Sequence, residues 1–117
     1  MKDPNREHQE AICIKYKTEK VDSPNQFRVG ISQNVRDGVL PINGVRITPQ
    51  GDSTGWFIWA GEWSDAPDFF RPLHVVHLKD WCPTAIPFLL LPPGWRFQVA
   101  PKYEDVWFDA DVKTGGQ

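Results

Sequence analysis

The stretch GWFIWAGE, residues 55–62, decides the fold that this sequence predicts. Its apolar run, WFIW, breaks the alternation that marks a strand with one solvated face. Such a run is typical of a central strand that is covered on both sides. Successive side chains of a strand point to opposite faces, so Trp56 and Trp59 lie on opposite faces and at least one of them faces the core. Trp63 lies beyond Gly61 and is expected in the loop after the strand.

Shorter strands are expected on both sides of this stretch. Alternating residues, bounded by turn-forming clusters, predict strands or extended segments at 11–17, 27–33, 45–49, 95–101 and 103–109. In the first of them, AICIKYK, the isoleucines and the tyrosine occupy one face and the lysines the other. The pairs Asp37-Gly38 and Asn43-Gly44 indicate turns.

Two short helices are expected between the central strand and the last two strands. The segment LHVVHLKDWC, residues 73–82, has helical spacing, which places three apolar residues on one face: Val75, Leu78 and Cys82. We expect Asp68 to cap this helix and Pro72 to lie in its first turn. The segment TAIPFLLL, residues 84–91, predicts a second short helix.

Strands, then helices, then strands again imply an α+β fold. We expect a single small domain at residues 11–112, built as a mostly antiparallel sheet of about five strands with one or two short helices packed on it. The chain ends, 1–10 and 113–117, are polar and are expected to be flexible.

Composition excludes several classes of function. The formal net charge is −2 and no basic stripe is present, so we expect no binding to nucleic acid. No apolar run has the length of a membrane span, and the N-terminal sequence MKDPNREHQE is too polar for a secretory signal. The two cysteines, Cys13 and Cys82, do not make a disulfide framework. We expect both to be reduced, buried thiols of a cytoplasmic protein.

His74 and His77 are the candidate metal ligands. At this spacing on a helix they can share a metal ion, with Asp80 and Cys82 close by in sequence. However, Cys82 falls on the other helix face, and the chain has no closely spaced pair of cysteines typical of structural zinc sites. We therefore expect no metal and no cofactor. The alternative function is a small-ligand- or metal-binding module, or a minor enzyme, that uses these histidines and the tryptophans.

Catalytic motifs are missing from the sequence. Three pairs of acids support acid–base chemistry only if they share a cleft, which sequence does not establish; they are Asp65 with Asp68, Glu104 with Asp105, and Asp109 with Asp111. Cys82 ends a helix before a proline, where the helix dipole disfavours a thiolate. We expect no catalytic residue.

Four segments carry a family pattern: ISQNV at 31–35, DSTGWFIWAGE at 52–62, HVVHLKDWCPTAIPFLLLPPG at 74–94 and WRFQV at 95–99. Together they resemble the immunity proteins of bacterial polymorphic toxin systems, in particular numbered immunity family thirty-three, formerly a domain of unknown function. The more specific motifs are Gly-Trp-Phe and Ile-Pro-Phe-Leu. The acidic run after the central strand is sparser here than in the family, and the C-terminal YEDVWFDADV extends further.

The resemblance implies a small cytoplasmic protein that binds and blocks a cognate protein toxin without turnover. The loop EWSDAPDFF, residues 62–70, combines acids that steer a basic partner with aromatic anchors. We expect five residues of this loop to face the toxin: Glu62, Trp63, Asp65, Asp68 and Phe69. The alternative is an ordinary loop whose aromatic residues pack into the core. Sequence leaves the toxin's identity and the oligomeric state open.

Overall fold

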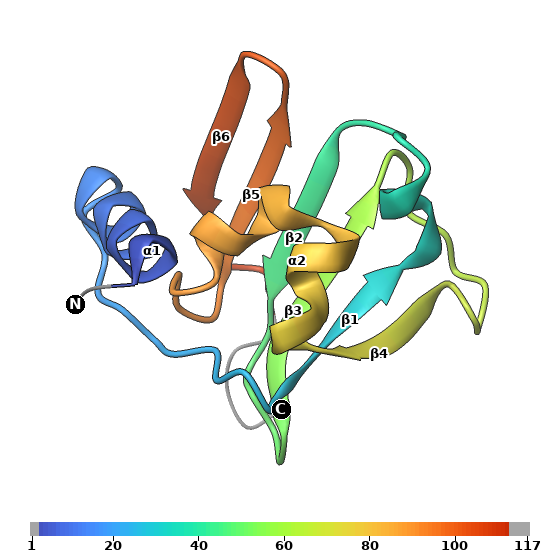
Figure 1. Cartoon of the computed structure of the whole chain (residues 1–117), viewed down its shortest axis with the longest axis horizontal. Helices are drawn as coiled ribbons and strands as arrows, with labels where there is room; N and C mark the ends of the chain where they lie inside the picture. The colour runs from blue at the N-terminus through green and yellow to red at the C-terminus, as the bar shows by residue number, and fades with distance from the viewer. Residues whose placement is uncertain (1–2, 113–117) are drawn as a thin grey trace.

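One six-stranded sheet organises the computed structural model of the chain, in which residues 3–112 are described (Figure 1). The strands are β1 (Arg28–Ser32), β2 (Ile42–Arg46), β3 (Ser53–Ala60), β4 (Phe70–His74), β5 (Trp95–Ala100) and β6 (Tyr103–Phe108). Five segments of the described residues are helical: α1 (Pro4–Lys15), α2 (Leu78–Trp81), and the 3-10 helices η1 (Gln33–Arg36), η2 (Val75–His77) and η3 (Pro83–Phe88). Among these, no helix has the length and apolar character needed to cross a membrane.

The strand β3 lies inside the sheet, as the GWFIWAGE stretch predicts. The strands are arranged in the order β4-β1-β3-β2-β5-β6. β3 pairs in parallel with β1, whereas the other four pairs of neighbouring strands are antiparallel. The prediction of an α+β fold with a mostly antiparallel sheet and short helices is confirmed, with six strands instead of about five.

The strand predicted at 11–17 is wrong, because most of these residues belong to the helix α1. Its first turn has strong helix-start signals. The Asp3 carboxylate accepts a hydrogen bond from the backbone N–H of Asn5 at 2.9 Å, and Pro4 occupies the first helical position, where no N–H is needed. The helix that begins at these residues continues through most of the segment 11–17, whose alternation is typical of a strand.

The burial pattern of α1 also fits a helix. Ile12 and Cys13 are buried, whereas Ile14 is 77% exposed, so the isoleucines do not share a face as they would in a strand. Residues 4–10, which were expected to be flexible, form the first part of α1. The remaining expected flexible residues, 1–2 and 113–117, lie outside the described residues.

The helix predicted at 73–82 begins later, because residues 70–74 form the edge strand β4. All five residues of β4 pair in register with β1. Asp68 therefore does not cap a helix, and Pro72 lies in a strand instead of a first helical turn. The short helices η2 and α2 follow, and their predicted apolar face is buried: Val75, Leu78 and Cys82.

The structure also differs from the predicted turn at Asn43-Gly44 and from the predicted second helix. Asn43 and Gly44 lie within β2 and not in the predicted turn. A Cβ atom on Gly44 would meet the Phe97 ring at 2.1 Å, so glycine lets this ring cross the backbone of β2. The second predicted helix is the 3-10 helix η3, with Pro87 inside it.

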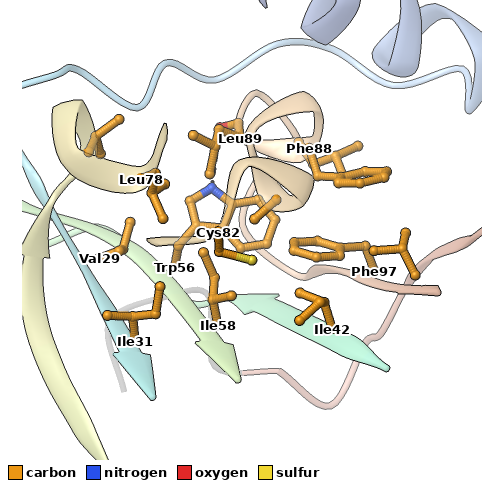
Figure 2. Close-up of a cluster of buried hydrophobic side chains, with 14 of the residues drawn as sticks. Val29, Ile31, Ile42, Trp56, Ile58, Leu78, Cys82, Phe88, Leu89 and Phe97 are labelled. Atoms are coloured by element: carbon orange, nitrogen blue, oxygen red, sulfur yellow. Dashed lines mark hydrogen bonds between the residues drawn. The ribbon is translucent and has the colours of Figure 1, made fainter. Parts of the chain in front are cut away.

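The core fills one side of the sheet (Figure 2). Trp56 is fully buried there, with its ring 5.5 Å from the ring of Phe97, and Phe97 stacks on Phe88 at 4.5 Å. All five helical segments contribute residues to this cluster. Figure 2 shows Leu78 and Leu89 lying above the strand residues that face them.

A buried arginine fixes the edge of this core. The side chain of Arg46 is 1% exposed, and its guanidinium donates hydrogen bonds to five backbone carbonyls: Thr54, Val21, Leu89, Leu91 and Asp22. Burial lowers the pKa of Arg46 to about 10, which still leaves it charged at neutral pH. The Trp56 indole donates to the Leu89 carbonyl at 3.2 Å. The segments at 21–22 and 89–91 are therefore tied to the sheet by polar contacts as well as by packing.

The second face of the sheet has no helix on it among the described residues, because all five helical segments pack into the core on the first face. Trp59 points to this second face and is nevertheless only 6% exposed. The prediction that Trp56 and Trp59 lie on opposite faces is therefore confirmed. The cover over Trp59 comes from the loop between β3 and β4, which carries Trp63.

Candidate protein-interaction surface

Five aromatic rings meet on the second face of the sheet. This aromatic cluster comprises Phe57, Trp59, Trp63, Phe69 and Phe70. Phe70 is its hub, since its ring centroid lies between 4.9 and 6.2 Å from those of the other four. Most of the contacts are edge-to-face or tilted, which is the arrangement that aromatic pairs favour. The cluster therefore fixes the relative positions of the loop and the two strands that it connects.

The root of the loop is held by side-chain amides. Asn34 donates a hydrogen bond to the carbonyl of Ala60 at 2.8 Å, and Asn43 donates to the carbonyl of Gly61 at 3.1 Å. Gly61 has φ +69, a left-handed conformation that glycine adopts without strain. The loop thus leaves β3 in one defined direction.

Trp63 is the most exposed residue of the cluster, and it is the one exposed tryptophan of the six. Its side chain is 52% exposed, whereas the other five tryptophans are buried or half-buried. The centroid of its ring lies 5.1 Å from that of Trp59, in an edge-to-face contact, and 5.1 Å from that of Phe70, in a tilted contact. Its indole N–H donates to the carboxylate of Asp65 at 2.9 Å. The ring is therefore held in place while about half of its surface faces solvent.

The loop that carries this ring also carries three carboxylates, of which Asp65 contacts the ring. Glu62, Asp65 and Asp68 are exposed, and none of them makes an ion pair within residues 3–112. Within the described residues, therefore, no lysine or arginine is in direct contact with these charges. Acids around an apolar centre produce a local negative potential, which attracts a basic surface.

A shallow groove continues the surface beside the cluster. It has a volume of about 250 Å³ and runs along Phe57, Phe70 and Pro72. A Cβ atom on Gly30 would lie 2.7 Å from the Phe57 ring, so this glycine lets the ring lie against β1. The groove is also lined by Arg28 and Arg71, and it shares Phe70 with the aromatic cluster.

The structure brings the sequence-predicted site residues into one region. Trp63 and Phe69 join the aromatic cluster, and the three acids lie along the same loop. Sequence reasoning misses Phe57, which it treats only as part of a covered strand. It includes Phe70 in the loop but not among the five residues that face the toxin, because the pairing of β4 with β1 that brings Phe70 into the cluster is not visible in the sequence.

The two histidines of the alternative function lie near each other. The ring centroids of His74 and His77 are 6.4 Å apart, and both side chains are exposed. Cys82 is buried in the core and is not available to them. Within residues 3–112, no group of three or more candidate metal-binding side chains lies together.

The cysteines and the paired acids, the other candidates for chemistry, have structural surroundings that explain them. Cys13 and Cys82 are both free and buried, as predicted, and burial raises the pKa of each thiol.

Glu104 accepts hydrogen bonds from Lys15 at 3.0 Å and from the Tyr16 hydroxyl at 2.5 Å. Burial acts to raise the pKa of Glu104, but these two hydrogen bonds, together with the nearby charges of Lys15 and His8, outweigh burial and lower the pKa.

Asp109 is likewise held by neighbours. It accepts a hydrogen bond from the backbone N–H of Asp111 at 2.9 Å, and it pairs with Arg96 at 3.1 Å. These contacts lower the pKa of Asp109, the backbone hydrogen bond being the largest cause. The hydrogen bond between Asp109 and Asp111 thus stabilises a turn, which gives this pair of acids a structural role.

Comparison with known proteins gives one result. A model of the Imm33-like domain family matches residues 8–109. The comparison with curated proteins found no match, and the comparison with solved structures found none. The family match takes in every strand of the sheet and most of α1. By this match over most of its length, the chain belongs to the Imm33-like domain family.

Proposed function

We propose that this chain is a non-catalytic immunity protein that acts in the cytoplasm and neutralises a cognate bacterial toxin by stoichiometric binding. The observation that carries the proposal is the half-exposed Trp63 in a fixed cluster, on a loop whose acids have no ion-pair partners in the described chain. Membership of the Imm33-like family supports the immunity role.

Trp63 supplies the anchor in this proposal. Tryptophan is enriched among the residues that dominate binding energy, and such residues lie at the centre of interfaces. Holding the ring against Trp59 and Phe70 before binding reduces the entropy lost when the partner docks. The neighbouring Phe69 ring, 6.4 Å from that of Trp63, extends the apolar centre.

The carboxylates of Glu62, Asp65 and Asp68 supply the rim. Their role is to attract a basic surface of the toxin and to fix its orientation, which affects association rate and specificity more than affinity. The groove beside Phe57 and Phe70 receives an apolar side chain of the toxin. Blocking then follows from occupancy, since the proposal includes no chemical step.

The test is a pull-down with the product of the gene that neighbours the one for this chain. The double variant Asp65→Lys and Asp68→Lys reverses the rim charge and is expected to abolish capture at moderate salt. The matched control reverses two exposed acids outside the loop and the segments that contact it, Glu19→Lys and Asp80→Lys, and is expected to capture normally. Urea midpoints of both variants are measured to show that each remains folded.

Undiminished capture by the loop variant would remove the loop from the proposed interface. Failure of the wild-type chain to capture the neighbouring protein, and to protect cells that express it, would remove the immunity role itself.

A further inference from the structure

The two edges of the sheet differ in how they are protected. At one edge, β4 has Pro72 at its centre, which removes a backbone N–H from that strand. At the other edge, β6 contains no proline and pairs with β5 over all six residues without a register shift. Figure 1 shows β6 as the last strand of the sheet. Natural proteins usually block their edges because an open edge pairs with another chain.

The backbone of β6 has hydrogen-bonding capacity left over. In an antiparallel pair, alternate residues point their N–H and C=O groups away from the partner strand. Among residues 3–112, no backbone hydrogen bond links residues 103–108 to any segment other than β5. The outer side of β6 therefore presents donors and acceptors in the spacing of a strand.

Four of the six side chains of β6 are also exposed. Tyr103 and Phe108, at its two ends, are 49% and 55% exposed, which makes them two of the most exposed large apolar side chains among the described residues. Asp105 is exposed between them, and Trp107 is half-buried against the guanidinium of Arg96. Apolar and acidic side chains thus alternate along one side of this edge.

The charge of this edge identifies its partner. Residues 103–112 include four acids and no lysine or arginine. Glu104 and Asp109 are paired with Lys15 and Arg96, but Asp105 makes no ion pair within residues 3–112. A second copy of the chain would bring two acidic strands together, which like-charge repulsion disfavours. A basic strand matches the edge instead.

We propose that the outer edge of β6 is a docking site for an extended basic segment of another protein, which adds to the sheet as a seventh strand. The backbone of residues 103–108 supplies the hydrogen bonds, and Asp105 pairs with a lysine or arginine of the incoming segment. Tyr103 and Trp107, on the same face as Asp105, contact its apolar side chains. β6 lies at the opposite edge of the sheet from β4, so this proposal does not depend on the loop at 61–69 binding a toxin.

The test is a nuclear magnetic resonance titration of the isotope-labelled full chain with a short synthetic peptide of alternating lysine and valine. The control peptide has the same side chains, but every backbone nitrogen is methylated, so it cannot donate strand hydrogen bonds. We expect amide shifts centred on residues 103–108 with the first peptide and none there with the second. Equal shifts with both peptides, or no shift in these residues at millimolar peptide, overturns the proposal.

A charge variant tests the choice of a basic partner. Asp105→Lys is expected to weaken binding of the lysine–valine peptide about two- to fivefold, as for a cross-strand charge pair. The control Asp37→Lys makes the same change of charge at an exposed position outside β6 and is expected to bind as the wild-type chain does. Equal affinities of the two variants overturn the role of Asp105, and urea midpoints confirm that both are folded.

Discussion

Replacing Arg46 by methionine tests how much the hydrogen bonds of this buried guanidinium contribute to stability. Methionine keeps much of the aliphatic volume and removes every donor of the guanidinium. Three of the lost hydrogen bonds end at buried carbonyls, and two of these carbonyls, Thr54 and Leu91, each at 2.9 Å, have no other side-chain donor among the described residues. A buried acceptor left without its donor costs about 1–3 kcal/mol, so the two together cost about 2–6 kcal/mol.

The other three carbonyls add little to this cost, and the loss of a buried charge reduces it. The carbonyl of Leu89 keeps donors from Trp56 at 3.2 Å and from Ser23 at 2.6 Å, so it is not left unsatisfied. The carbonyls of Val21 and Asp22 are only partly buried, and water can reach them. Removing a buried charge also recovers the desolvation that lowers the pKa of Arg46 to about 10. We therefore expect Arg46→Met to lower the free energy of unfolding by about 3 kcal/mol.

The assay is urea unfolding followed by circular dichroism and tryptophan fluorescence at neutral pH. A domain with the usual stability of about 5–15 kcal/mol would stay folded at 25 °C but unfold at a clearly lower urea concentration. The control is Arg28→Met, which makes the same replacement at an exposed arginine paired with Asp52 and should leave the midpoint almost unchanged. A loss of less than about 1 kcal/mol in Arg46→Met would refute the structural role given to this side chain.

Three other outcomes follow from the described contacts. Gly44→Ala places a Cβ atom 2.1 Å from the Phe97 ring and should destabilise the fold by about 1–3 kcal/mol or more, measured by urea midpoints. Cys13 and Cys82 should not react with a thiol reagent at pH 7 in the folded chain, because both are buried with raised pKa, and both should react in denaturant. Glu104 has a lowered pKa when folded, so its stabilising contribution is present above about pH 4.5 and is lost as the pH falls through its folded pKa. Glu104→Gln should therefore narrow the difference in urea midpoint between pH 7 and pH 3, and an unchanged difference would contradict this.

The central part of the fold was predictable from sequence because its signals are local. The unbroken apolar run at 56–59 predicts an inside strand, and the three-residue spacing of Trp56 and Trp59 predicts their opposite faces, as found. The alternation at 95–101 likewise marks β5. In each case the burial pattern follows directly from strand geometry.

The wrong predictions concern segments whose residues fit both a strand pattern and a helix pattern. Residues 11–17 alternate like a strand, but the capping Asp3 and Pro4 lie outside that window and favour a helix. Residues 70–74 look like the approach to a helix, and only their pairing with β1, distant in sequence, makes them a strand. The aromatic cluster depends on that pairing through Phe70, so its full membership could not be read from the sequence.

The central claim is that most tryptophans hold the body together while Trp63 is displayed for binding. Isothermal titration calorimetry between this chain and the product of its neighbouring gene tests it most directly. We expect one-to-one binding by the wild-type chain and a rise in Kd of about thirtyfold or more for Trp63→Ala, corresponding to about 2 kcal/mol or more. Ile14→Ala, a truncation at another exposed apolar side chain far along the sequence, should bind as the wild-type chain does. Equal affinity of Trp63→Ala and the wild-type chain would contradict the claim.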